Sequence, residues 1–142
     1  ASRYPNKTVV GLLEEMGSIL GQLFQRSDDL LDYDVRNAEN KAILGDLKSK
    51  YLNSFGTFVC RGRSRDEISK IVQSQSLGEF KLNLGGEAVF DALLKEFDDI
   101  NSQKIQLYFH LLEKLKEQLQ PSEQGLVTFL KPLPDLLYWR RK

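Results

Sequence analysis

Apolar side chains recur every three or four residues through two long stretches of the chain, residues 8–33 and residues 87–119. This spacing places the apolar side chains on one face of an α-helix. Residues 98–102 are mostly polar and include Asn101 and Ser102 as candidate helix caps, which leaves open whether the second stretch is one helix or two. The sequence therefore predicts an all-α fold, a helical bundle whose 142 residues suffice for one domain.

Shorter segments carry local signals for where helices begin and end. Ser64 followed three residues later by Glu67 is a capping box, and it predicts a helix that continues through Val72. Residues 74–83 are polar and are predicted to form a loop with room for a short helical turn, and the two glycines at 85–86 are predicted to form a break. The remaining signals are prolines: Pro121 near the start of a helix, Pro132 at its end and Pro134 at the start of a last short helix.

Composition excludes several classes of protein. Twenty basic and twenty acidic side chains cancel, so nothing favours a nucleic-acid partner. One cysteine, Cys60, cannot form an internal disulfide and fits a reducing, cytoplasmic compartment. The apolar runs are far shorter than the roughly 20 residues of a membrane span, and residues 1–5 do not resemble a signal peptide. The single histidine, His110, is predicted to pack within a helix rather than bind a ligand.

Three carboxylates lie close together near the end of the first apolar stretch. Asp28, Asp29 and Asp32 are spaced so that Asp28 and Asp32 are one helical turn apart. Several apolar residues surround them, and no lysine follows until Lys41. The apolar neighbours are Leu20, Leu23, Phe24, Leu30 and Leu31. A buried carboxylate cluster needs cations, and carboxylate oxygens suit Mg²⁺, whose other positions are filled by water and phosphate oxygens. The carboxylates alone are equally compatible with a Mg²⁺-diphosphate site and with a helix end that merely carries acids.

The wider spacing around these carboxylates resembles a motif of a known family. A glycine, a Phe-Gln pair and an Asp-Asp-x-x-Asp cluster follow one another as in the second aspartate-rich motif of the trans-isoprenyl diphosphate synthases. The matching residues are Gly21, Phe24, Gln25, Asp28, Asp29 and Asp32. Further along the chain, Lys41, Gly45 and Asp46 are similar to the Gly-Lys…Gly…Asp segment of that family. Residues 138–142 resemble the basic tail that ends many farnesyl diphosphate synthases.

The resemblance implies the C-terminal part of the isoprenoid synthase fold, with residues 1–142 as the C-terminal half of a synthase domain. The family's first aspartate-rich motif belongs to an N-terminal half that this sequence lacks. The chain would then be a fragment or a subunit, acting with that half or a partner subunit as a homodimer or heteromer. The implied reaction is the Mg²⁺-dependent head-to-tail condensation of isopentenyl diphosphate with an allylic diphosphate. We expect these 142 residues alone to be inactive.

The resemblance also implies a role for individual residues. Asp28 would be the direct Mg²⁺ ligand, while Asp29 and Asp32 would complete the metal site by holding metal-bound water. Asp28, Asp29 and Lys41 are the implied catalytic residues, and Lys41 would hold the leaving diphosphate. The other implied substrate-binding residues are Phe24 and Gln25, Lys50 (with Lys48 as the alternative for the same role), and Arg140, Arg141 and Lys142 over the homoallylic diphosphate.

Two segments depart from the family pattern. Residues 45–50 do not continue as the usual Gly-Lys-Ser/Thr sequence, and Arg26-Ser27 stands where the family tends to have an apolar residue. Two alternatives therefore remain beside the prenyl synthase. One is a terpene cyclase-type or head-to-head condensing enzyme on the same fold. The other is a non-catalytic helical subunit that stabilises a partner in a two-chain synthase.

Overall fold

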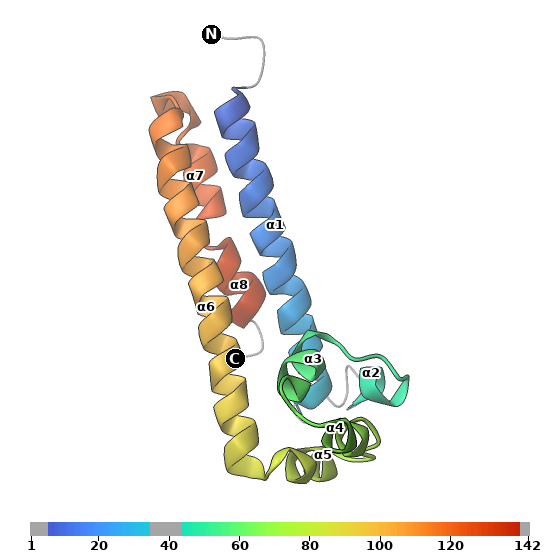
Figure 1. The fold of residues 1–142 in the computed structure, drawn as a ribbon. Coiled ribbons are helices and arrows are strands. Elements are labelled where there is room, and N and C mark those ends of the chain that lie inside the picture. The colour runs from blue at the N-terminus through green and yellow to red at the C-terminus, as the bar shows by residue number, and fades with distance from the viewer. Residues whose placement is uncertain (1–5, 35–43, 140–142) are drawn as a thin grey trace. The chain divides into compact units, whose positions relative to one another are not determined.

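The computed structural model describes residues 6–34 and 44–139, and every element of regular structure among them is a helix (Figure 1). The all-α class predicted from the periodicity is therefore confirmed. The chain divides into two compact units, each with its own core. The first unit contains the chain up to Ser27 and from Asn101 onward, and the second contains Asp28–Ile100.

Two long helices follow the two periodic stretches. Helix α1 (Lys7–Leu30) begins where the Asn6 side chain accepts a hydrogen bond from the amide of Thr8 (2.8 Å), and it ends in a 3₁₀ turn, η1 (Leu31–Tyr33). Helix α6 (Glu87–Gln118) is continuous, so a break at 98–102 does not occur. Asn101 is fully buried, and its side-chain amide donates to the Tyr138 hydroxyl (3.0 Å) instead of capping a new helix.

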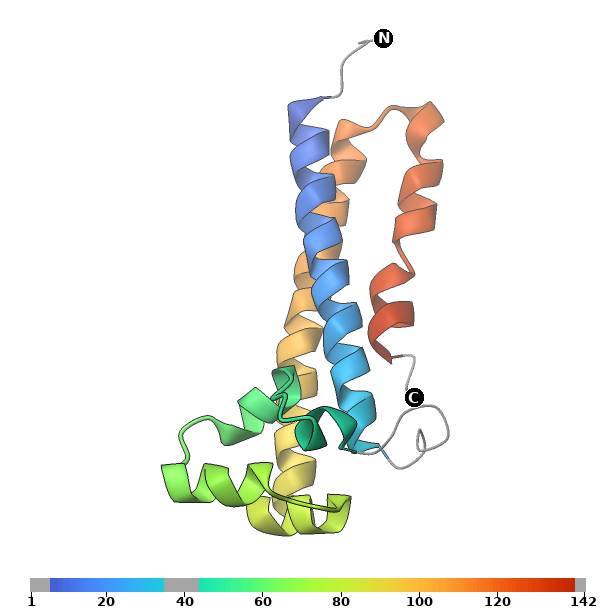
Figure 2. The ribbon, with the colours of Figure 1, turned by 90° about the vertical axis from the view of Figure 1, so that its right-hand side faces the viewer.

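In the first unit, α7 (Gly125–Leu130) and α8 (Leu133–Tyr138) return alongside α1 and α6 (Figures 1 and 2). The 3₁₀ turn η3 (Pro121–Glu123) precedes them. Side chains from all four helices fill the core between them. Its buried apolar members are Met16, Ile19, Leu23, Ile105, Tyr108, Leu111, Leu112, Leu115, Leu130 and Tyr138.

Buried hydrogen bonds fix the two short helices in the first unit. The Tyr108 hydroxyl donates to the carbonyl of Leu130 at the end of α7 (2.6 Å). The Ser27 hydroxyl donates to the carbonyl of Tyr138 at the end of α8 (3.0 Å). Tyr138 is fully buried, so its ring anchors the last helix. His110, in contrast, is exposed on α6, so its prediction as a packed residue was wrong.

The second unit contains four short helices before α6: α2 (Gly45–Lys48), α3 (Ser54–Cys60), α4 (Arg65–Val72) and α5 (Leu77–Leu84). The predicted Ser64 cap is confirmed, since its hydroxyl accepts from the amide of Glu67 (3.2 Å). Most of the loop predicted at 74–83 is helical, since α5 is longer than the short helical turn expected there. Ser76 caps α5 by accepting from the amide of Glu79 (3.1 Å), and Phe80 is buried within that helix.

An aromatic cluster forms the core of the second unit. Phe55 is fully buried, and its ring centre lies 5.1 Å from that of Tyr33, 5.3 Å from Phe97 and 5.9 Å from Phe90. These contacts are edge-to-face, the geometry that aromatic rings prefer. Phe55 is in the first turn of α3, two residues after the N-cap residue Asn53. The start of α3 therefore packs on the aromatic core.

Candidate functional site

The three carboxylates of the aspartate-rich stretch differ in exposure. Asp28 and Asp29 are in the last turn of α1, and Asp32 is in η1. Asp28 is half-buried, whereas Asp29 is 3% exposed and Asp32 is fully buried. Sequence spacing alone places Asp28 and Asp32 on one helical face, but the change to a 3₁₀ turn at Leu31 alters the direction of the second side chain. Asp28 is thus the one of the three that keeps substantial contact with solvent.

Asp29 caps a helix that lies far from it in the sequence. Its Oδ2 accepts from both the amide of Ser54 (2.9 Å) and the hydroxyl of Ser54 (2.5 Å), at the first residue of α3. The preceding residue, Asn53, donates from its side-chain amide to the Asp29 carbonyl (3.1 Å). The Asn53 side chain also accepts from the amide of Gly56 (3.0 Å). These bonds satisfy amides at the start of α3 that have no partner within the helix.

Asp32 holds the segment that leads into α2. Its Oδ1 accepts from the amide of Asp46 (3.1 Å), and its carbonyl accepts from the amide of Leu44 (2.8 Å). The Asp46 carboxylate in turn accepts from the side-chain amide of Asn53 (3.0 Å). Asp29, Asp32, Asp46, Asn53 and Ser54 therefore form one connected set, called here the carboxylate network.

The electrostatic effect of these anions is visible at the neighbouring tyrosine. Burial raises the pKa of the Tyr33 hydroxyl well above its usual range, and the charges of Asp32, Asp46 and Asp29 raise that pKa further. Tyr33 is therefore neutral at physiological pH. The network thus concentrates negative charge beside the aromatic core of the second unit.

The other predicted site residues belong to one or the other unit or lie outside the described residues. Phe24 and Gln25 are on the part of α1 that belongs to the first unit, where Phe24 is 45% exposed and Gln25 is also exposed. Lys50 is exposed and has a left-handed backbone (φ 61°). It lines a pocket of about 360 Å³ in the second unit together with Leu47, Tyr51, Leu52, Val72 and Gln73. Lys48, its alternative, is also exposed. The predicted residues outside the described part of the chain are Lys41, Arg140, Arg141 and Lys142.

The fit of a metal ion depends mainly on Asp28. Within residues 6–34 and 44–139, no three His, Cys, Asp or Glu side chains are grouped so that they could hold an ion between them. Mg²⁺ in proteins commonly takes only one or two carboxylates, with water and phosphate oxygens filling its other positions. Half-buried Asp28 could supply one carboxylate ligand, while water and phosphate oxygens would fill the other positions around the ion. Asp29 Oδ2 already accepts two hydrogen bonds from Ser54, and Asp32 Oδ1 accepts a hydrogen bond from the amide of Asp46.

Sequence reasoning missed Asn53 and Ser54. Both stand immediately before the apolar residues of α3, and an Asn-Ser pair in that position is a signal for the start of a helix. That signal predicts the cap. It does not predict that the second capping group comes from Asp29, since the two positions are 25 residues apart.

Comparison of the chain with known protein families, with characterised proteins and with solved structures found no match. The resemblance to the prenyl synthases therefore rests on the motif residues alone. Among the helices of the described chain, none has the length and apolar character needed to cross a membrane.

Proposed function

We propose that this chain supplies the second aspartate-rich motif of a Mg²⁺-dependent prenyl diphosphate synthase. Isopentenyl diphosphate and an allylic diphosphate would be its substrates, in the cytoplasm. A second chain or segment with a first aspartate-rich motif would complete the site, because these 142 residues contain only one such motif. The proposal is supported by the six motif positions and by the all-helical fold in which they occur.

The observation that carries the proposal is the difference in burial within the motif. Asp29 and Asp32 are almost completely buried and bound to Ser54 and Asp46, so they hold the backbone around the end of α1. Asp28 is half-buried at the same helix end. A half-buried carboxylate next to two buried ones suits a shared metal site, because its oxygen must be held in place and still reach the ligand.

Each residue then has a definite task. Bound Mg²⁺ would neutralise the charge that develops on the diphosphate as it leaves. Asp28 would offer a carboxylate oxygen, and Asp29 would keep the last turn of α1 against α3. Phe24 would supply apolar contact to the prenyl chain, and Gln25 a polar orienting group; both side chains are exposed.

One observation favours a second candidate, a non-catalytic helical subunit of a two-chain synthase. An intact aspartate cluster is unexpected in a chain that only stabilises a partner. However, Asp29 and Asp32 make hydrogen bonds that stabilise this fold whether or not a metal binds. Their presence is therefore compatible with a purely structural chain, and among the three aspartates it is the role of Asp28 that distinguishes the two candidates.

The two candidates are separated by an activity measurement. Radiolabelled isopentenyl diphosphate and geranyl diphosphate are incubated with the chain alone, and with the chain plus a partner that carries a first aspartate-rich motif. We expect no turnover by the chain alone and turnover with the partner. Asp28→Ala should then reduce turnover at least about 100-fold, as expected for loss of a group that stabilises developing charge.

Asp91→Ala is the matched control, since Asp91 is an exposed acid in α6. This variant should leave turnover unchanged. Full activity of the Asp28→Ala complex would refute the catalytic role and support the non-catalytic subunit. Turnover by the isolated chain would contradict the requirement for a second motif.

A further inference from the structure

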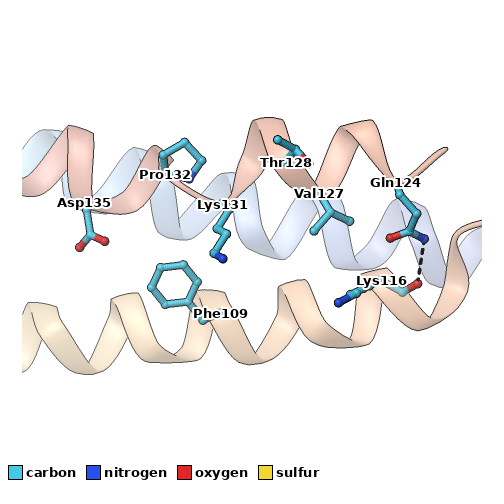
Figure 3. A pocket seen from close by; sticks show the side chains of 8 residues that line it. All are labelled: Phe109, Lys116, Gln124, Val127, Thr128, Lys131, Pro132 and Asp135. Carbon is cyan, nitrogen blue, oxygen red and sulfur yellow. Dashed lines mark hydrogen bonds between the residues drawn. The ribbon is translucent and has the colours of Figure 1, made fainter. Parts of the chain in front are cut away.

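A groove in the first unit lies between the second half of α6 and the segment from α7 to α8 (Figure 3). Its volume is about 580 Å³, which is within the range of small-molecule pockets in proteins. Helix α6 contributes Phe109 and Lys116, and the opposite wall contributes the rest. The lining residues of that wall are Gln124, Val127, Thr128, Lys131, Pro132 and Asp135.

The middle of the groove is apolar. Phe109 points from α6 toward the opposite wall, and Val127 points toward α6 further along the groove (Figure 3). Pro132 also lines the groove, on the opposite wall next to Lys131. One end is closed by Gln124, whose side-chain amide donates to the carbonyls of Lys116 (3.5 Å) and Leu119 (3.3 Å). A ligand with an apolar body would bury that body on these side chains.

Two lysines reach into the groove from opposite walls. Lys116 extends from α6, and Lys131 extends from the end of α7 toward Phe109 (Figure 3). No ion pair within 4 Å joins either lysine to Asp135 or to another acid in the described chain. Both ammonium groups are therefore available to an anion. A phosphate monoester carries a charge between about −1.5 and −2 at pH 7, which two lysines can balance.

The walls of the groove are fixed before any ligand arrives. The buried bond from the Tyr108 hydroxyl to the Leu130 carbonyl (2.6 Å) seats the end of α7 on α6, next to Lys131. Pro132 and Pro134 restrict the backbone that follows. A preformed site loses little conformational entropy on binding, so even a shallow groove can bind measurably.

We propose that this groove binds a small amphiphilic phosphate: a phosphate monoester head between Lys116 and Lys131, with a short apolar body on Phe109, Val127 and Pro132. Asp135, at the other end of the groove, disfavours a second anionic group there and accepts a hydrogen bond from a donor on the ligand. All lining residues belong to the first unit and none belongs to the carboxylate network. The inference is therefore independent of the proposed prenyl transfer.

The test is an NMR titration of the ¹⁵N-labelled 142-residue chain with hexyl phosphate below its micelle concentration. The amides of Val127, Thr128 and Lys131 should shift saturably. Hexanol lacks the charge and inorganic phosphate lacks the apolar body, so each should bind at least about tenfold more weakly. Equal binding of hexanol would overturn the selection for an anion, and absence of saturable shifts would overturn the site.

Substitution of the two lysines tests whether they bind the phosphate group. Lys116→Gln/Lys131→Gln should weaken hexyl phosphate binding at least about tenfold, because both cations are lost. Lys114→Gln is the matched control, since Lys114 is an exposed lysine of α6 that does not line the groove. Circular dichroism verifies that each variant keeps its helices. Equal weakening by Lys114→Gln would show a non-specific charge effect and contradict the proposal.

Discussion

The carboxylate of Asp29 accepts two hydrogen bonds from Ser54, one from its amide and one from its hydroxyl. This pair joins the last turn of α1 to the first turn of α3. Hydrogen bonds to a charged group are stronger than those between neutral groups, and a buried amide that loses its acceptor is costly. We therefore regard Asp29 primarily as a residue that stabilises the second unit.

Removal of this carboxylate should destabilise the chain. Asp29→Ala is expected to lower the free energy of unfolding by about 2 kcal/mol, since it removes a helix cap and a charge-assisted bond. Asp29→Asn keeps an acceptor oxygen and should cost less. Urea denaturation measures both. If half-buried Asp28, changed to Ala, lowers stability as much as Asp29→Ala does, the assignment of different roles to the two residues is wrong.

Glycine substitutions should have opposite effects at different helical positions. At Gly11 and Gly17 a Cβ would meet nothing within 4 Å among the described residues, so close packing does not require glycine at either position. Alanine there should stabilise by roughly 0.5–1 kcal/mol each. At Gly56 a Cβ would lie 2.8 Å from Leu52 Cδ1 and 3.0 Å from the Tyr33 hydroxyl, so Gly56→Ala should destabilise. A stabilising Gly56→Ala in urea denaturation would contradict the described packing of α3.

The buried tyrosines predict a loss of stability at alkaline pH. Burial raises the pKa of Tyr108 to about 12 and that of Tyr33 well above its usual range. The unfolded chain releases these protons near pH 10, whereas the folded chain retains them, so stability is intact below about pH 10 and falls as the pH rises above it. Urea midpoints measured across this range check the slope, and Tyr108→Phe should make it shallower. Stability that is constant up to pH 12 would be contrary to this expectation.

The positive charge of Lys104 lowers the stability of the folded chain, and a neutral side chain would remove this loss. Burial lowers the pKa of Lys104, and the nearby Arg26 guanidinium lowers it further. Because the folded state disfavours the charged form, Lys104→Gln should raise the melting temperature by a few degrees at pH 6. The gain should shrink as the pH rises through the lowered folded-state pKa, and it should vanish above the unfolded pKa of about 10.4, where the lysine is neutral in both states. Lys114→Gln is the exposed control and should change little; a lower melting temperature for Lys104→Gln would contradict the argument.

The long helices were predictable because their apolar periodicity extends over many turns, and both α1 and α6 follow it. Helix α5 was not, because Gly78 and several polar residues weaken its pattern, and its stability comes from the Ser76 cap and from burial of Phe80 and Leu84. The continuity of α6 through residues 98–102 could not be predicted from the sequence either. Asn101 has a low helix propensity, but its buried bond to Tyr138 outweighs that preference.

The candidate site was only partly predictable for a similar reason. The spacing of Asp28, Asp29 and Asp32 was evident, but their different burial depends on α3 and on Asp46, which approach from elsewhere in the chain. No local pattern connects Asp29 with Ser54. Tertiary contacts therefore divide a motif that is uniform in sequence into one half-buried carboxylate and two buried ones.

The role of Asp28 is tested most directly by paramagnetic relaxation with Mn²⁺ and inorganic pyrophosphate, since Mn²⁺ takes the same oxygen ligands as Mg²⁺. In wild-type chain, we predict that Mn²⁺ with pyrophosphate selectively broadens the amide signals of residues 27–30, and that Asp28→Asn abolishes this broadening while Asp91→Asn does not. Broadening that is absent in the wild type, or that persists in Asp28→Asn, would contradict the assignment of Asp28 as a ligand for a diphosphate-bound cation.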